Sequence, residues 1–259
     1  MHSDTKFVRR RLLVTGAAAL AATAGVRAQA PELRRYAVIS LIGDQLVLVY
    51  ANRVTGSSLD RNLRRPPPDA NGSFDKFALT AVGQAIERAD PKAKVSLLGV
   101  GPSPLHETPE KLLDGKTMSL PGSLVTALDQ MQATHVVLLT KYRGETNIPL
   151  RRERIGIGSL RGLGYYIDGS PSLRMADTGK SGEGLLAPYV YVQLTLADAR
   201  TGAVLRQQTV AAAQAYAVAE HDTAVDPWDV LTSEEKISRL RRLLEAKLTS
   251  EVASLLAPG

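Results

Sequence analysis

The chain has 259 residues, of which 44% are hydrophobic and 5% aromatic, and it contains no cysteine. Its length allows a sizeable core without cross-links, and the lack of cysteine excludes a disulfide framework and a lipid-anchoring cysteine. Of the formal charge of +6, residues 1–30 contribute most, since 27 basic and 25 acidic residues remain beyond them. This near balance argues against a dedicated nucleic-acid binder, and the scarcity of aromatic residues argues against a base-stacking platform.

The first 28 residues have the pattern of a secretory signal peptide. Arg9–Arg11 precede an apolar run, Leu12–Val26, which is shorter than the roughly 20 apolar residues that a membrane span needs. Small residues follow, so we expect cleavage after Ala28, or after Ala30. The sequence therefore predicts a soluble periplasmic or secreted protein, with no membrane span and no lipid anchor.

The export route stays open between two alternatives. Two arginines, any residue and two apolar residues match the twin-arginine pattern, which Arg9–Leu13 satisfies. However, Val8 stands where a serine or threonine is usual, and general secretory signals also carry three arginines.

The first part of the exported chain shows two short apolar runs, 36–42 and 46–50, separated by Gly43–Gln45. Runs of this kind predict strands, and the short turn between them favours a hairpin. A proline-rich loop, 57–73, follows, because three consecutive prolines interrupt regular structure. Helical spacing of apolar residues then predicts a helix from Phe74 to Asp90.

The middle of the chain alternates the two element types. We expect a strand over 95–100, a short helix over 109–113, a helix over 123–132 and a strand over 134–142. Residues 143–187 then hold nine glycines and show no sustained period. This segment is predicted to be a flexible insertion.

The last part of the chain has the clearest local signals. Strands over 189–197 and 203–213 flank the tight turn Thr201–Gly202. A loop over 219–230 holds the single tryptophan. Thr232 and Glu235 have the spacing of a capping box at the start of a long final helix.

The expected order is β-β-α-β-α-β, the insertion, and then β-β-α. We find no internal repeat and no linker that divides it. The sequence therefore predicts one α/β (α+β) domain over 31–259, with a mixed sheet and helices packed on it.

Three motifs resemble sites of known chemistry but fail at a decisive position. Ile42–Asp44 is similar to the block that opens the GDSL esterases, but Gln45 replaces their nucleophilic serine. Gly179–Ser181 ends like a phosphate-binding loop, yet Arg174 stands where the first glycine is needed. Gly156–Gly162 misplaces the third glycine of the dinucleotide fingerprint. We therefore expect no catalytic residue and no cofactor.

Metal ligation has weak support as well. The histidines beyond the leader are His106, His135 and His221, which are scattered along the chain. His221 with Asp222 and Asp226 has the residue types of a ligand cluster, but the sequence favours an acidic surface loop. We expect no metal site.

The glycine-rich insertion is the predicted binding surface. Long loops in compact domains are usually functional or disordered, and arginine with tyrosine is typical of contact surfaces. The candidate binding residues are Arg151, Arg152, Arg154, Arg161, Tyr165 and Tyr166.

Two segments resemble recurring parts of periplasmic α/β domains. They are Thr134–Leu139, preceded by an amphipathic helix, and Val192–Leu205, where Asp-Ala-x-Thr-Gly turns one strand into the next. The set includes the curli-secretion lipoprotein family, the lipoprotein activators of penicillin-binding proteins and the N-terminal domain of the Tol–Pal propeller protein. The resemblance implies a non-enzymatic envelope protein that contacts another envelope protein. This chain lacks their anchoring cysteine and the propeller repeats.

The sequence therefore favours an exported envelope protein that acts by protein or ligand binding in an assembly or accessory role. A periplasmic hydrolase with its site beneath residues 143–187 is the alternative. A third interpretation makes that insertion a membrane hairpin of an outer-membrane assembly subunit. The partner, any substrate and the oligomeric state stay open.

Overall fold

The computed structural model describes residues 33–52, 60–68, 73–150, 153–174, 181–217 and 226–257. The helices are α1 (Phe74–Ala89), α2 (Gly122–Gln130) and α3 (Ser233–Leu256), with the short 3-10 helices η1 (Pro104–His106), η2 (Pro109–Leu112) and η3 (Pro227–Val230). The strands are β1 (Arg35–Leu41), β2 (Val47–Tyr50), β3 (Leu63–Arg65), β4 (Lys94–Leu98), β5 (Leu113–Asp114), β6 (Thr117–Met118), β7 (His135–Lys141), β8 (Arg143–Glu145), β9 (Ile148–Pro149), β10 (Arg154–Ile155), β11 (Ser159–Arg174), β12 (Ser181–Asp198), β13 (Val204–Ala213) and β14 (Tyr216–Ala217). The predicted mixed α+β fold is confirmed.

One half of the main sheet is parallel. Strand β1 lies between β4 and β7 and pairs with both in parallel register, with Val38 opposite Leu97 on one side and Val137 on the other. All of β1 after Arg35 is buried. Burial on both faces explains the continuous apolar run that the sequence shows.

The predicted hairpin between the first two strands is wrong. β1 pairs with β4 and β7, whereas β2 pairs in parallel with β11 and antiparallel with β3. The sequence signal was ambiguous, because a short turn between two apolar runs is typical of hairpins. Here the chain leaves one part of the sheet at Leu41 and enters another at Val47.

The long strand β12 connects the two halves of the sheet. Residues Val192–Asp198 pair with β7, and the preceding stretch up to Tyr191 pairs with β11. On its other edge, β12 pairs with β13 over Tyr189–Ala197, a stretch that includes residues paired with β7 and residues paired with β11. β7 and β11 therefore succeed one another along one edge of β12, and the sheet forks where β7 ends.

The segment predicted as an irregular insertion contains regular structure. It includes β8, β9, β10, the whole of the 16-residue strand β11, and the start of β12. Leu163, Tyr165, Tyr166 and Ile167 of β11 are all buried, so both faces are covered and no polar alternation appears. The glycines of this segment also argued against a strand, because glycine is depleted in strands generally.

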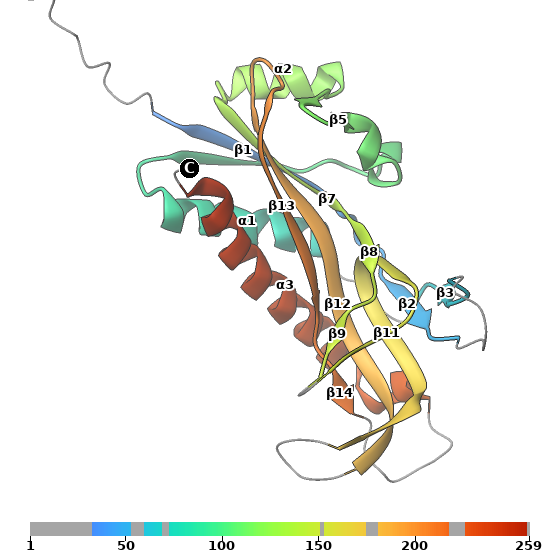
Figure 1. Cartoon of the computed structure of the whole chain (residues 1–259). Coiled ribbons are helices and arrows are strands. Elements are labelled where there is room, and N and C mark those ends of the chain that lie inside the picture. The colour runs from blue at the N-terminus through green and yellow to red at the C-terminus, as the bar shows by residue number, and fades with distance from the viewer. Residues whose placement is uncertain are drawn as a thin grey trace, which may run out of the picture. The chain divides into compact units, whose positions relative to one another are not determined.

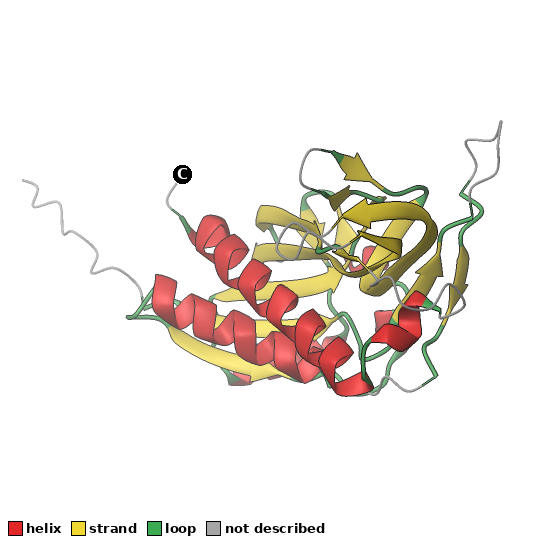
Figure 2. Ribbon diagram, turned by 90° about the horizontal axis from the view of Figure 1, so that it is seen from below, coloured by secondary structure: helices red, strands yellow, loops and turns green. Residues whose placement is uncertain are grey.

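Helices cover both faces of the parallel half (Figures 1 and 2). α1 and α3 pack against one face, where Val38 and Val137 join Val82 and Leu244 in one apolar cluster. Leu128 of α2 belongs to a second cluster on the other face. The alternating side chains of β1 divide between these clusters, as the period of two in a strand requires.

Local predictions at the C-terminal end are confirmed. β12 and β13 form the expected hairpin, and Asp198 accepts hydrogen bonds from the Thr201 backbone and hydroxyl at 2.7 and 2.8 Å. The helix α3 begins with the predicted capping box, in which Thr232 and Glu235 satisfy each other's backbone N–H groups. Trp228 is buried beside Tyr165, with ring centroids 5.4 Å apart.

Gly164 is required where β11 meets β2. A Cβ at this position would lie 1.9 Å from the carbonyl oxygen of Val47 and 2.6 Å from the Tyr189 hydroxyl. We expect Gly164→Ala to lower the free energy of unfolding by about 1–3 kcal/mol or more, the usual cost of overpacking. Gly169→Ala in the same strand is the matched control, because its Cβ would meet nothing within 4 Å. Urea unfolding checks this, and equal stability of both variants would contradict the close approach.

Candidate functional site

The carboxyl ends of the three parallel strands lie on one edge of the sheet. The next helix after β1 is α1 on one face, whereas the connection after β4 leads to α2 on the opposite face. Neighbouring strands whose connections diverge in this way leave a crevice at their carboxyl ends. A cavity of about 690 Å³ lies there, which we call the strand-end cleft. It is lined by Gly43, Asp44, Gln45, Asp75, Lys76, Leu79, Thr80, Leu97, Gly99, Val100, Pro102, Ser103, His106, Glu107 and Lys141.

Asp75, the second residue of α1, is the centre of a polar cluster at this cleft. One carboxylate oxygen accepts hydrogen bonds from the Ser40 hydroxyl at 2.6 Å and from the Gly43 backbone N–H at 3.1 Å. The other oxygen lies 3.1 Å from Nε2 of His106. Asp75 thus links the end of β1, the turn after it and η1.

Two carboxylates already occupy the N-terminus of α1. Asp44 accepts the backbone N–H of Asp75 at 2.9 Å, and Asp75 itself lies in the first turn. The positive end of a helix dipole favours anions, and these side chains satisfy that preference within the chain. The N-terminus of α1 is therefore already occupied by carboxylates of the chain itself.

Both ring nitrogens of His106 face acceptors. Nδ1 lies 3.1 Å from the Ser103 carbonyl oxygen, and Nε2 faces the Asp75 carboxylate. A carbonyl and a carboxylate both accept hydrogen bonds. Both ring nitrogens are therefore in contact with acceptors of the chain itself, and neither contacts a hydroxyl group of the described residues.

A second, smaller cavity adjoins the cleft at the fork of the sheet. Its volume is about 380 Å³, and we call it the basic cavity because four of its lining residues are cationic. It is lined by Gln45, Val47, Val49, Arg64, Glu107, Lys141, Arg143, Ser159, Arg161, Leu163 and Tyr189. Gln45, Glu107 and Lys141 line both cavities.

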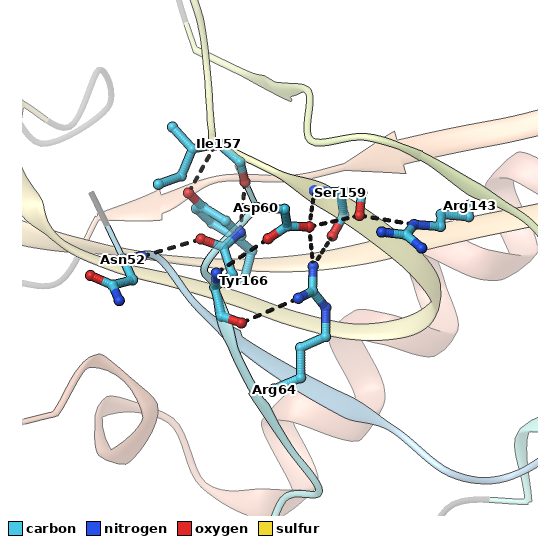
Figure 3. Close-up of polar contacts among 8 residues, drawn as sticks. Asn52, Asp60, Arg64, Arg143, Ile157, Ser159 and Tyr166 are labelled. Carbon is cyan, nitrogen blue, oxygen red and sulfur yellow. Dashed lines mark hydrogen bonds and ion pairs between the residues drawn. The ribbon is translucent and has the colours of Figure 1, made fainter. Parts of the chain in front are cut away.

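A network around Asp60 forms one wall of the basic cavity (Figure 3). Asp60 accepts the Ser159 backbone N–H and hydroxyl at 3.0 and 2.8 Å, and it pairs with Arg64 at 2.5 Å. Arg64 also donates to the Ser159 carbonyl oxygen at 2.9 Å. Arg143 Nε donates to the Ser159 hydroxyl at 3.1 Å. The network ties the start of β11 to the chain around β3.

The cations of the basic cavity differ in how they are paired. Arg64 is held by Asp60, and Arg161 lies 3.4 Å from Glu110. Lys141 and Arg143, in contrast, form no ion pair with a carboxylate in the described residues. With the Glu107 carboxylate counted, these two side chains still leave the cavity with an excess of positive charge.

The predicted binding residues that the structure describes lie in different places. Arg161 lines the basic cavity, while Arg154 lines a separate cavity of about 290 Å³. Tyr165 and Tyr166 are fully buried: Tyr165 donates to the Lys236 carbonyl oxygen at 2.5 Å, and the Tyr166 hydroxyl accepts the Ile157 N–H at 3.2 Å. The two tyrosines are core residues. Arg151 and Arg152 lie outside the described residues.

Sequence reasoning missed Lys141, Arg143 and Asp75 as site residues. Lys141 ends a predicted strand and Asp75 begins a predicted helix, so each is adjacent to a correctly placed element. A parallel arrangement of the strands would have placed their ends together. The mistaken hairpin removed that signal.

The other candidate motifs gain no chemistry from the structure. His135 begins β7 and its ring lies 5.3 Å from that of Tyr36. Over the described residues, no three His, Asp or Glu side chains gather closely enough to hold a metal ion. Within the same part of the chain, no helix has both the length and the apolarity of a membrane crossing. His221 and Gly179 lie outside the described residues.

This geometry defines an α+β protein with a forked mixed sheet. No protein-family model and no curated protein matches the chain. Solved structures with similarity include a neuraminyllactose-binding hemagglutinin homolog from Helicobacter pylori, with 9% identity, TM-score 0.41 and coverage of 87% of each chain. PelC from Paraburkholderia phytofirmans, a dodecamer, has 11% identity, TM-score 0.31 and coverage of 87% of this chain and 89% of its own.

A third structure is protein XCC0632 from Xanthomonas campestris, described as DUF330, with 6% identity and TM-score 0.38. The match covers 86% of this chain and 84% of the XCC0632 chain. Similarity this low assigns no function to the present chain. None of the three is named as a curli-secretion, penicillin-binding-protein-activator or Tol–Pal protein, so that expected kinship is not confirmed.

The Asp60 network makes stability depend on pH in the acid range. Burial alone would raise the pKa of Asp60, but hydrogen bonds from Arg64, Ser159 and Asn62 outweigh it and lower the pKa from 3.8 to about 2. A lowered folded-state pKa stabilises the fold above the unfolded value and loses that effect as pH falls to the folded value. We expect the stability difference between wild type and Asp60→Asn to be constant near neutrality and to shrink between about pH 4 and pH 2. Urea unfolding across that range tests it, and a constant difference would exclude the network as the cause.

Proposed function

We propose that this chain is an exported binding protein that holds a small ligand in the strand-end cleft. The observation that carries the proposal is a cavity of about 690 Å³ at the diverging connections after β1 and β4. Ligand sites in open α/β sheets lie at such points, and they commonly measure roughly 300–1,000 Å³. The ligand-binding form of the predicted binding role is therefore the one that the geometry supports.

The lining of the cleft suits recognition of a small molecule. Leu79, Leu97, Val100 and Pro102 supply apolar surface. Charged groups line it beside this apolar surface, among them Asp75 at the N-terminus of α1 and Lys141 at the end of β7. Pockets that bind ligands combine an apolar lining with a few placed polar groups that fix orientation.

The hydrolase alternative has less support at this site. Ser40 is fully buried, and its hydroxyl donates to Asp75 rather than to His106. A serine nucleophile needs a neighbouring base that accepts its proton. His106 instead bridges Asp75 and the Ser103 carbonyl oxygen, which favours a structural role in shaping the cleft.

The proposed location of the protein outside the inner membrane rests on its leader sequence. Arg9–Arg11, the apolar run and the small residues at the end of the leader have the order of a cleavable export signal. Binding, assembly and accessory roles in the envelope are all compatible with a cleft that opens at one edge of the sheet.

Filling the cleft should abolish ligand capture. Gly99 lines the cleft, and a Cβ there would meet nothing within 4 Å, so Gly99→Trp places an indole in open space without a backbone clash. We expect the affinity for the neutral dye N-phenylnaphthylamine, measured by fluorescence titration, to fall at least about tenfold, or about 1.4 kcal/mol.

Gly101→Trp is the matched control, because Gly101 is equally open but does not line the cleft. Equal dye binding by both variants and the wild type would place the dye elsewhere. Absence of dye binding to the wild type would contradict an apolar binding cleft.

The mature protein from its native host should begin at Gln29. Cleavage after Ala28 follows from the small residues at the end of the leader, and N-terminal sequencing or intact-mass measurement reads it directly. Ala28→Arg should block cleavage at that bond, whereas Gln29→Ser should leave it unchanged. A native protein that retains Met1 to Ala28 would contradict export by this signal.

A further inference from the structure

The strand-end cleft and the basic cavity adjoin at the fork of the sheet. They share the lining residues Gln45, Glu107 and Lys141, which come from three separate segments of the chain. Gln45 lies between β1 and β2, and Lys141 is the last residue of β7. A ligand that enters the cleft therefore has a second, chemically different space beside it.

The two spaces differ in polarity. The cleft offers Leu79 and Leu97, the latter 46% exposed on β4 although it is a large apolar side chain. The basic cavity offers Lys141 and Arg143, two residues apart in sequence, neither of which is paired with a carboxylate in the described residues. Arginine presents a planar set of donors that suits carboxylate and phosphate oxygens.

Fixed charges of both signs line the two spaces. Asp44 and Asp75 lie at the N-terminus of α1, where the backbone N–H of Asp75 already donates to Asp44, and Lys76 lines the cleft beside them. In the basic cavity Lys141 and Arg143 outnumber the Glu107 carboxylate, so an anion is attracted there. Arg64 and Arg161 also line the basic cavity, but their pairing with Asp60 and Glu110 leaves them little net charge to add.

We infer that the ligand is an amphiphile with one anionic group, which binds Lys141 and Arg143 while its apolar part lies along Leu79 and Leu97. The inference rests on the proposed function and specifies the ligand class. A lipid-like molecule with a phosphate group and a smaller apolar acid share this chemistry. A free inorganic anion lacks the apolar part and uses only one of the two spaces.

The test compares three probes that separate these features. Dodecyl phosphate carries both features, dodecyl maltoside carries only the apolar chain, and inorganic phosphate carries only the anion. Isothermal titration of the full-length mature protein, below the micelle concentration of each amphiphile, gives the affinities. We expect dodecyl phosphate to bind most tightly, with an advantage over the maltoside that falls as salt is added.

Variants assign the anionic group to the fork. Lys141→Gln combined with Arg143→Gln should weaken dodecyl phosphate at least about tenfold, since two charged donors are lost, and leave the maltoside unchanged. Lys92→Gln combined with Arg200→Gln removes the same charge at exposed positions outside both cavities, and it should leave all affinities unchanged. Circular dichroism and the thermal midpoint verify that each variant is folded.

The outcomes distinguish this inference from the proposed function. If both amphiphiles bind with equal affinity and Gly99→Trp weakens both, the cleft binds ligands but the anionic specificity is wrong. Inorganic phosphate binding as tightly as dodecyl phosphate would also overturn the amphiphile. If neither amphiphile binds the wild type, both the inference and the proposed function are overturned.

Discussion

The change of pairing partner from β7 to β11 along one edge of β12 determines where the candidate binding site lies. The last β7 residue that pairs with β12 is Lys141, which lies opposite Val192. The neighbouring β12 residue, Tyr191, pairs with Gly162 of β11 instead. Two strands cannot occupy the same edge, so they diverge at this point. The Tyr142 and Gly162 backbones bridge the junction, with the Gly162 N–H donating to the Tyr142 carbonyl oxygen at 3.3 Å. The fork brings cations from β7, β8 and β11 around one cavity.

The fork makes unusual demands on the sequence of β11. A Cβ on Gly162, where φ is +70°, would lie 3.2 Å from the Lys141 side chain, and Gly164 lies directly against the Val47 carbonyl. Glycine is therefore needed to let the strands separate and to admit a parallel neighbour. The same feature places Gly162 against the aliphatic part of the Lys141 side chain, and Lys141 lines both cavities.

Elements that depend on contacts between residues close in sequence were predicted well. Strand pairings between segments far apart in sequence were not. The stripe of α3 and the β12–β13 turn depend on residues close in sequence, such as Thr232 with Glu235 and Asp198 with Thr201. The pairing of β1 with β4 and β7 depends on residues far apart in sequence, so the short turn at Gly43 misleadingly favoured a hairpin. The candidate site consists of strand ends, and its composition could not be predicted while the pairing was wrong.

Charges with and without an ion-pair partner lie side by side in the basic cavity. The Asp60 carboxylate accepts hydrogen bonds from Arg64, Ser159 and Asn62. These contacts fix the start of β11 relative to the chain around β3. A wall built from a paired carboxylate and guanidinium is rigid but contributes little net charge. Lys141 and Arg143 line the same cavity without an ion-pair partner in the described residues, although Arg143 also donates to the Ser159 hydroxyl. A binding surface of this kind is preorganised, because the structural contacts are made before the ligand arrives and the two remaining cations are left to meet it.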